Sequence, residues 1–493
     1  MSVINTNVSS LQAQNSLKAN ETKLSSAMAR LSSGIRINSA KDDAAGLAIT
    51  TRMTSEVRGL TQAVRNANDG ISVAQTAEGS LGEITNILQR LREIAVQSAN
   101  ASNNGTDRSF LNTEAQQLIQ ETQRIGTQTN FNGIKLLDGT FSSKDFQVGA
   151  NQGEVITFNT IADSTAAGLG AHKLKSVTSG TGLLGKLETA DAGAIPDNET
   201  LGRIAGEGFK IQTSGGGISD EITYADKSGA DVIAAAINAK ATDIGVTAVA
   251  RNSTTLSNLN ATGTTTVTME LNGKAITATV ADKNDLTALV AAINGVTSDT
   301  KVSASFTNAI GKSSITLTSR DGSDITVKDF ATGTAGDSID MGGDALTDGG
   351  DNSNRKVGTV ELTSTQGQVT TVNAEVNLFG ATGSNNSVIA SIETVDISSQ
   401  AGASDALSVI DAALTQVNNT RAALGGLINR FEATVSNQNT TIMNLSASRS
   451  RILDTDYAVE TTNLAKAQII QQAATAMLAQ ANQSSQSVLA LLK

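Results

Sequence analysis

Side chains able to carry out chemistry are few in this chain of 493 residues. There is no cysteine, and His172, in the run AHKLKSV, is the single histidine. Zinc and other transition-metal sites normally combine several cysteine and histidine ligands, so the sequence argues against them. A serine hydrolase triad would depend wholly on His172, which we expect instead on a surface loop. The sequence therefore predicts that the protein is not an enzyme.

Two other segments contain residue types that bind ligands. GTGLLG, Gly180 to Gly185, has the letters of a dinucleotide-binding turn, but no apolar strand precedes it, which favours a flexible turn. GDSIDMGGDALTDGGD, Gly336 to Asp351, lacks the alternating carboxylates of an EF-hand, which favours a solvated loop. We expect no cofactor.

Composition narrows the choice of partners. The net charge of −11 argues against nucleic acid, because phosphate binding requires a basic face. No stretch of 18 apolar residues occurs, so we expect no membrane insertion. The N-terminus, MSVINTNVSS, has neither the positive nor the apolar region of a Sec signal peptide, which leaves export by another route open.

Apolar residues recur at heptad spacing near both ends of the chain, which predicts long helices. One stripe runs from Leu17 to Ile35, and a second runs from Ile49 to Ala95. Near the C-terminus a stripe runs from Leu407 to Ile452. The last stripe contains Leu464, Ile470, Met477, Val488 and Leu492. Because their lengths match, we predict that the two ends pair antiparallel.

A short polar stretch interrupts the helical pattern at each end. RINSAKDDAAGLAI, Arg36 to Ile49, separates the first two stripes, and RILDTDYA, Arg451 to Ala458, separates the last two. Ser39 or Asp42 could cap the second helix, because a short side-chain oxygen accepts from the first backbone N–H groups. Asp42 and Asp43 in the first turn would also complement the helix dipole.

Between the helical ends the sequence changes character. A further helical segment is expected from Ala101 to about Asp138, and NFNGIKLLDGTF and DFQVGANQGEVITF then predict hairpins. From about 176 to 396 the chain is rich in Thr, Ser, Gly and Asp, and TVTMELNGKAITATV predicts another hairpin. ADK at 225–227 and AAIN at 235–238 both recur 56 residues later. This spacing predicts a duplicated module of hairpin, helix and strand.

The terminal stripes have little to bury within one chain. They are rich in Ala, Gln, Asn and Ser, and aromatic residues make up only 2% of the sequence. Weakly amphipathic helices of this kind are often unstable alone and gain order by packing against neighbouring subunits. The pattern therefore predicts a polymer.

The chain closely resembles bacterial flagellin at both ends. The similar text includes MSVINTNVSSLQAQNSL, LSSGIRINSAKDDAAGLAI, RNANDGISVAQTAEGSL and LQRLREIAVQSAN near the N-terminus. It also includes RILDTDYAVETTNLAKAQIIQQAATAMLAQANQ and SVLALLK near the C-terminus. The resemblance covers roughly residues 1–160 and 400–493, and the middle resembles the variable region of that family.

The resemblance implies a multidomain α+β fold, an antiparallel rod or coiled coil of long terminal helices with β-rich variable outer domains inserted. Residues 1–42 with 456–493 would form the inner filament core, and 43–175 with 397–455 the rod and its β-hairpins. Residues 176–396 would be the outer region, with modules at about 209–262 and 263–327. The spoke between the two helical layers would contain Asn38, Ser39, Lys41, Asp42, Asp43, Asp454 and Asp456.

In function, the resemblance implies a secreted subunit of the extracellular flagellum that self-assembles into the filament for swimming, after type III export. Its partners would be further copies, hook-junction and cap proteins, and an export chaperone on the stripe from Leu464 to Leu492. A host Toll-like receptor would recognise the monomer through a face that also helps to pack neighbouring subunits, containing Gln89, Arg90, Glu93, Ile94, Gln97 and Glu114. The alternative is a cap, hook-junction or adhesive protein of the same export system.

Overall fold

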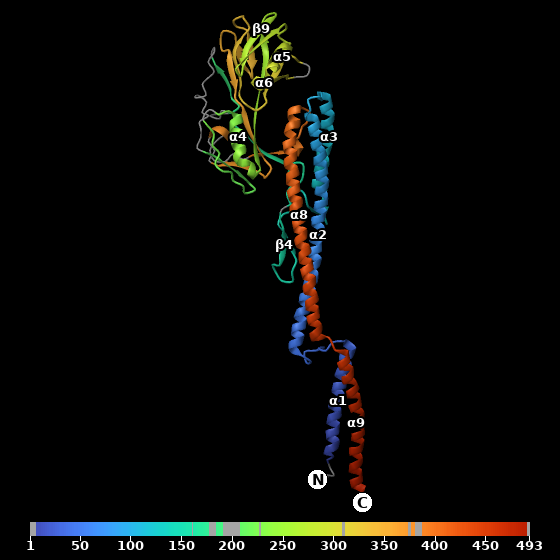
Figure 1. Cartoon of the computed structure of the whole chain (residues 1–493). Helices are drawn as coiled ribbons and strands as arrows, with labels where there is room; N and C mark the ends of the chain where they lie inside the picture. Colours follow the sequence, from blue (N-terminus) through green and yellow to red (C-terminus); the bar gives the residue numbers. More distant parts are fainter. Residues whose placement is uncertain are drawn as a thin grey trace. The chain divides into compact units, whose positions relative to one another are not determined.

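Long helices near both ends of the chain flank a β-rich middle region, so the expected mixture of α and β structure is confirmed (Figure 1). The computed structural model describes residues 6–159, 161–176, 184–190, 208–225, 228–307, 311–372, 376–379 and 387–490. It divides into two compact units, each built from separate stretches of sequence. The first contains residues 1–75, 143–159 and 425–493, and the second contains residues 76–142 and 160–424.

The helices at the two ends are long and continuous. They are α1 (Val8–Ser33), α2 (Ala44–Ala99), α8 (Gln400–Leu453) and α9 (Tyr457–Ala490). α2 has 56 residues and α8 has 54, as their uninterrupted heptad stripes predict. Asn7 caps α1 by accepting from the Ser10 N–H at 3.0 Å, which satisfies one of the unpaired donors of the first turn.

The helices pair antiparallel, also as expected. In the terminal pair, which we define as α1 and α9, Asn20 lies against Ala467 and Arg30 against Glu460, so one helix ascends as the other descends. α2 and α8 also run antiparallel. Their polar contacts are Thr54 with Arg449 in the first unit, and Glu78 with Arg421 and Arg92 with Asp411 in the second.

In the first unit, a cluster of three phenylalanines fixes a hairpin against the long helices. Phe146 in β3 (Lys144–Gln147) and Phe158 in β4 (Val155–Phe158) have ring centroids 5.8 and 6.1 Å from that of Phe431 in α8. Phe431 is fully buried. A Cβ atom at Gly70 of α2 would lie 2.8 Å from Phe431 Cζ, so glycine permits this close approach.

In the second unit, α3 (Gly105–Gln128) joins α2 and α8, and all three run together (Figure 1). Asn104 and Asp107 form a capping box at its start. The expectation of helix as far as about Asp138 is wrong. The chain turns at Asn132 and Gly133, which both have positive φ, and forms the predicted hairpin of β1 (Asn130–Phe131) and β2 (Ile134–Lys135).

The rest of the second unit is built from short strands and helices. The strands are β5 (Gly170–Lys175), β6 (Leu187–Ala190), β7 (Lys210–Thr213), β8 (Val246–Asn260), β9 (Thr265–Leu271), β10 (Lys274–Val280), β11 (Val302–Phe306), β12 (Ser314–Ser319), β13 (Ile325–Ala331), β14 (Ser338–Met341), β15 (Asp344–Thr347), β16 (Ser353–Lys356), β17 (Thr359–Ser364), β18 (Val369–Val372) and β19 (Val388–Ser391). The helices are α4 (Ala230–Ala241), η2 (Thr242–Ile244), α5 (Thr287–Gly295), α6 (Thr297–Thr300), α7 (Val376–Phe379) and η3 (Ile392–Thr394).

Two larger sheets contain most of these strands, and β7 and β18 pair in a separate two-stranded sheet. One larger sheet has the order β10-β9-β13-β16-β6, and the other has the order β11-β12-β8-β17-β5-β19, with β14 and β15 attached to β8. The long strand β8 serves two hydrophobic cores. Its beginning contributes Val246 and Ala248 to one core, and its end contributes Leu256 and Leu259 to the other.

Two expectations for this region need correction. The aspartate-rich run Gly336 to Asp351 is not a solvated loop, because β14 and β15 pair across a turn at Gly342 and Gly343, both with positive φ. His172 is not on a surface loop but in β5, opposite Ser364 of β17. Of the run GTGLLG, residues 180–183 lie outside the described residues.

Elements of matching type recur 56 residues apart in the middle region. α4 leads to β8 as α5 leads to β11, and Asn238 and Asn294 occupy equivalent helix positions. Each asparagine makes two hydrogen bonds to the strand that follows. Asn238 bonds both backbone groups of Ala248 at 2.7 Å, and Asn294 bonds both of Ala304 at 2.8 Å. Of the ADK repeat, Asp226 and Lys227 lie outside the described residues.

We expect Asn294→Ala to destabilise its module by about 1–3 kcal/mol, because it leaves the buried N–H and C=O of Ala304 without these partners. Hydrogen exchange over residues 287–306 measures the loss. Asn238→Ala should have an effect of the same size on residues 230–250. Asn284→Ala is the control, since among the described residues its side chain bonds only to Asp282, within an exposed loop. Unchanged hydrogen exchange in both Asn294→Ala and Asn238→Ala would contradict the prediction.

The chain enters and leaves the β-rich middle region on neighbouring strands. β5 and β19 pair antiparallel, with Lys173 opposite Val388 and Gly170 opposite Ser391. Ile392, which follows β19, is fully buried, and its N–H donates to the Leu169 carbonyl oxygen at 2.9 Å. The strands on which the chain enters and leaves are therefore adjacent. The residues that follow β19 pack against the segment that precedes β5.

Candidate functional site

The interface of the terminal pair is thin and leaves large apolar side chains exposed. Small residues fill it at Ala27 and Ala467, and the buried Asn20 donates from Nδ2 to the Ala467 carbonyl oxygen at 2.7 Å. Exposed apolar side chains on the two helices include those of Val8, Leu11, Met28, Val459, Ile469, Ile470 and Met477. Exposed apolar surface of this extent is typical of interaction surfaces.

The predicted C-terminal stripe lies mostly on this exposed surface. Leu464 is half-buried, whereas Ile470 is 42% exposed and Met477 is 66% exposed. The side chain of Val488 and all of Leu492 lie outside the described residues. α9 therefore offers much of its stripe to another molecule.

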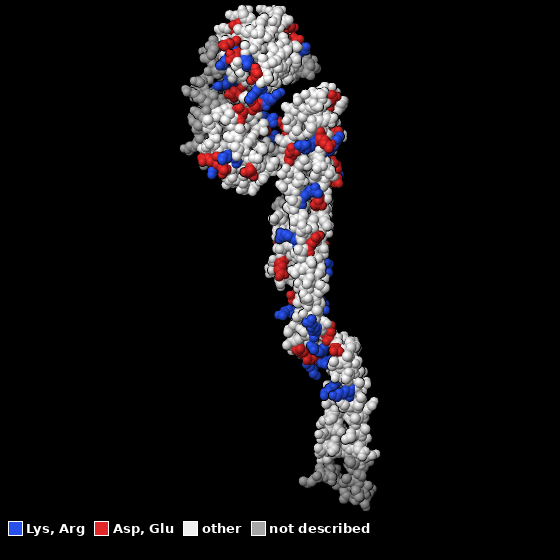
Figure 2. All heavy atoms as spheres, in the orientation of Figure 1, with Lys and Arg blue, Asp and Glu red and all other residues white. Residues whose placement is uncertain are grey.

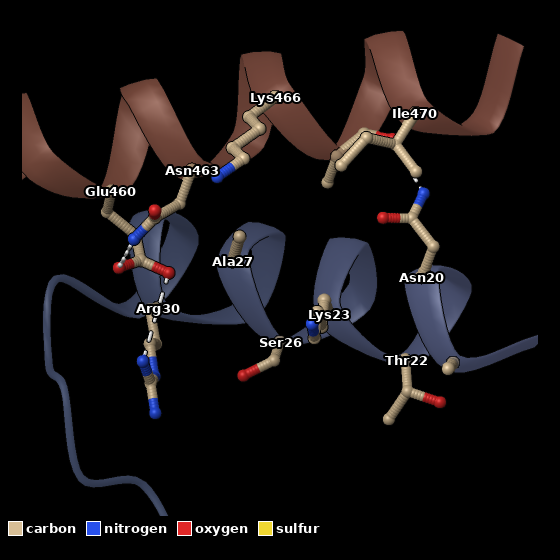
Figure 3. A pocket seen from close by; sticks show the side chains of 12 residues that line it. Asn20, Thr22, Lys23, Ser26, Ala27, Arg30, Glu460, Asn463, Lys466 and Ile470 are labelled. Atoms are coloured by element: carbon tan, nitrogen blue, oxygen red, sulfur yellow. Dashed lines mark hydrogen bonds and ion pairs between the residues drawn. The ribbon is translucent and has the colours of Figure 1, made fainter. Parts of the chain in front are cut away.

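A groove of about 730 Å³ runs between the two helices of the terminal pair (Figure 3). Lys23 and Arg30 of α1 and Glu460 and Lys466 of α9 are its charged residues. Arg30 Nη1 lies 3.9 Å from Glu460 Oε1, and Asn463 Nδ2 donates to Glu460 Oε2 at 3.4 Å. The groove thus combines three cations with one carboxylate, which favours an anionic partner.

The two interrupting stretches hold each other through backbone hydrogen bonds. α1 ends at Gly34, whose φ of 70° lies in the left-handed region that glycine adopts without strain. The Arg36 N–H then donates to the Leu453 carbonyl oxygen at 2.6 Å, and the Thr455 N–H donates to that of Gly34 at 3.0 Å. Both helical breaks therefore occur at the same place in the first unit.

The predicted spoke residues lie in these breaks, but the prediction that Ser39 or Asp42 caps α2 is wrong. Asp43 is the cap of α2, because its carboxylate accepts from the Gly46 N–H at 2.8 Å. The backbone N–H groups of Ser39 and Asn38 instead donate to Asp42, which lowers its pKa. Neither aspartate lies in the first turn of α2. The other predicted spoke residues are Lys41, which is exposed, Asp454, which pairs with Ile35 through its backbone, and Asp456, which caps α9.

A charge cluster lies on the exposed surface of the second unit. Arg90 of α2 donates to Glu93 Oε2 at 3.0 Å and to Glu114 Oε1 of α3 at 2.9 Å. These hydrogen bonds raise the pKa of the Arg90 guanidinium. The side chains of Arg90 and Glu114 are about half exposed and that of Glu93 is 68% exposed, and Gln89 and Gln97 are exposed beside them. The structure thus brings five of the six predicted receptor-face residues to one surface.

The sixth residue, Ile94, does not lie on this surface. Its side chain is fully buried, together with Leu91 and Ala95. A binding partner cannot contact Ile94 without unpacking α2. Its packing in the core holds the part of α2 that carries Arg90 and Glu93 in place.

Sequence reasoning missed the charged groove of the terminal pair. Lys23 and Arg30 are seven residues apart, so they share one helix face, and Glu460 and Lys466 are close to that spacing on α9. This regular spacing of charged residues beside the apolar stripes is the sequence signal from which the groove could have been predicted.

Within the described ranges, no group of three or more His, Cys, Asp or Glu side chains is arranged to hold a metal ion. Burial lowers the pKa of His172, whose Nδ1 has no hydrogen-bond partner there. None of the described helices is long and apolar enough to cross a membrane.

The fold defines a class of chain in which paired terminal helices flank a β-rich insertion. Comparison with known families finds the N-terminal helical region of bacterial flagellin over residues 4–142 and the C-terminal helical region over 407–492. A flagellin of Salmonella choleraesuis (strain SC-B67) is 38% identical over 100% of this chain and 99% of its own. Flagellin B of Vibrio cholerae serotype O1 (strain ATCC 39541) is 35% identical over 99% of each chain. A solved structure of FliC from Burkholderia pseudomallei is 21% identical, with a TM-score of 0.29 over 73% of this chain and 99% of that chain.

The chain belongs to the bacterial flagellin family. It is a structural subunit of the flagellar filament, and its flagellin relatives match it from end to end.

Proposed function

We propose that this subunit polymerises through its terminal pair into a filament used for swimming. The observation that carries the proposal is the exposed apolar surface of α1 and α9, which includes Met28, Ile469 and Met477. In a polymer, neighbouring copies would bury this surface, at roughly 25 cal/mol per Å² of apolar area. Export through the flagellar type III pathway would deliver the chain to the growing filament outside the cell, where hook-junction and cap proteins would be its neighbours.

The layers of that filament would follow the division of the sequence. Residues 1–42 with 456–493 would form the inner core, and residues 43–175 with 397–455 the surrounding rod. Residues 176–396, with modules at about 209–262 and 263–327, would face outward. The breaks around Gly34 and Asp454 would form the spoke, because the chain there leaves one helix pair and enters the next.

We expect a variant lacking residues 176–385 to polymerise like the full chain. Lys173 and Val388 already pair, so the deletion leaves residues 174, 175, 386 and 387 as a hairpin loop. Electron microscopy and sedimentation of the purified variant measure polymerisation. Loss of polymerisation by the folded variant would contradict an outward, replaceable role for this region.

A longer deletion, of residues 176–396, provides the comparison. It also removes β19 and the buried side chains of Ile392 and Val395. This variant should fold less stably than the shorter deletion.

An export chaperone is proposed to cover the C-terminal stripe before assembly. The exposed Ile470 and Met477 would otherwise promote association inside the cell. Deleting residues 463–493 should weaken binding of the chaperone from the same bacterium at least about 100-fold, or ~2.7 kcal/mol, in calorimetric titrations. Deleting residues 1–33 is the matched control and should leave binding intact. Unchanged binding after the C-terminal deletion would refute this assignment.

Recognition of the monomer by a host Toll-like receptor is proposed for the charge cluster of Arg90, Glu93 and Glu114, with Gln89 and Gln97. An exposed arginine held by two carboxylates is preorganised for contact, and arginine is enriched among interface anchors.

A cap, hook-junction or adhesive role is the alternative from the same export system. Electron microscopy of the purified chain separates the two, since a filament subunit propagates into long filaments. Persistent short caps or rings would favour the alternative.

A further inference from the structure

The groove of the terminal pair contains more positive charge than its own residues neutralise. Lys23, Arg30 and Lys466 line the groove together with a single carboxylate, that of Glu460. The 3.9 Å separation between Arg30 and Glu460 is longer than a hydrogen bond, and Arg30 Nε is buried without a hydrogen-bond partner. In the described part of the chain, neither Lys23 nor Lys466 has an ion-pair partner. The groove can therefore accept a second carboxylate.

A suitable carboxylate lies on the opposite side of α1. Arg30 follows Glu21 by nine residues, which is two and a half turns at about 3.6 residues per turn. Glu21 therefore points away from the groove while lying level with Lys23. It is exposed, and among the described residues it has no ion-pair partner. One side of the terminal pair thus carries an anion, and the other side carries a cationic groove.

We propose that the groove of one copy receives the Glu21 carboxylate of a second copy. Complementary surfaces on opposite sides of one molecule make a head-to-tail contact, which repeats from copy to copy and generates a ring or a helix. This inference rests on the proposed polymerisation through the terminal pair. It adds the residues that would orient adjacent pairs.

Charge exchange between the two surfaces tests the proposal. Lys466→Glu and Glu21→Lys should each raise the critical concentration for polymerisation at least about tenfold, equivalent to ~1.4 kcal/mol. The double variant should return it to near the wild-type value, because the ion pair is restored with reversed sign. Lys466 is chosen over Lys23 because it lies on α9. Lys23 lies on α1 two residues from Glu21, so changing it would also change the charge close to Glu21 within the same copy. Added sodium chloride should reduce the difference in critical concentration between the wild type and Lys466→Glu, since exposed charges are screened.

Lys283→Glu is the matched control. It makes the same change in net charge at an exposed position of the outer region, and it should polymerise normally. The proposal is overturned if Lys466→Glu polymerises like the wild type, or if the double variant is no better than either single variant. Rescue by Asp454→Lys in place of Glu21→Lys would overturn the choice of Glu21. Failure of the wild-type chain to polymerise would overturn the proposed function instead.

Discussion

Replacing Phe431 with alanine is expected to destabilise the first unit by about 3–5 kcal/mol, the range observed for buried phenylalanines. The ring is fully buried, and its centroid lies 5.8 Å from that of Phe146 and 6.1 Å from that of Phe158. Alanine would leave a cavity where the hairpin meets α2 and α8, and Gly70 has no side chain to fill it. Urea unfolding followed by circular dichroism measures the loss.

Phe110→Ala is the control for this prediction. Phe110 is 71% exposed on α3, so its replacement should change the free energy of unfolding by less than about 0.5 kcal/mol. Equal effects of the two substitutions would show that the aromatic cluster does not stabilise the unit.

The second large effect concerns the proposed receptor surface. We expect Arg90→Ala to lower activation of the Toll-like receptor by monomer at least about tenfold, a loss of ~1.4 kcal/mol. The substitution removes a planar donor that a partner would contact, and it leaves Glu93 and Glu114 without the guanidinium that bridges them. It should hardly change folding, because an exposed ion pair typically contributes below about 1 kcal/mol. A cell-based receptor assay with purified monomer measures the effect.

Arg124→Ala is matched to Arg90→Ala in chemistry and exposure. Arg124 pairs with Glu121 on α3 at 2.6 Å, and both side chains are about half exposed. It lies outside the predicted receptor face, so activation should be unchanged. If Arg90→Ala monomer is folded and fully active, or if the two substitutions act alike, the recognition surface lies elsewhere.

The long helices could be predicted because their apolar periodicity continues without interruption for many turns. The burial of Ile94 could not be predicted from this periodicity, because it depends on which other helices pack against α2. A single heptad stripe suggests one buried face, whereas α3 and α8 both pack along α2 in the second unit and bury a wider arc. Ile94 falls within that wider arc.

Other details depend on competition between local signals. Ser39, Asp42 and Asp43 all have side chains suited to capping, and the path of the chain between the two breaks decides in favour of Asp43. The aspartates of the run from Gly336 to Asp351 suggested solvation. Alternating burial of Ile339, Met341 and Leu346 instead makes that run a hairpin on β8.

We propose that this chain polymerises by itself through its terminal pair. The direct measurement is addition of purified full-length chain to sonicated filament fragments, followed by electron microscopy and helical reconstruction. We expect filaments that elongate in proportion to added chain, with α1 and α9 at the smallest radius. Chain that remains monomeric in the presence of these seeds, or filaments with α1 and α9 at the outer surface, would contradict it.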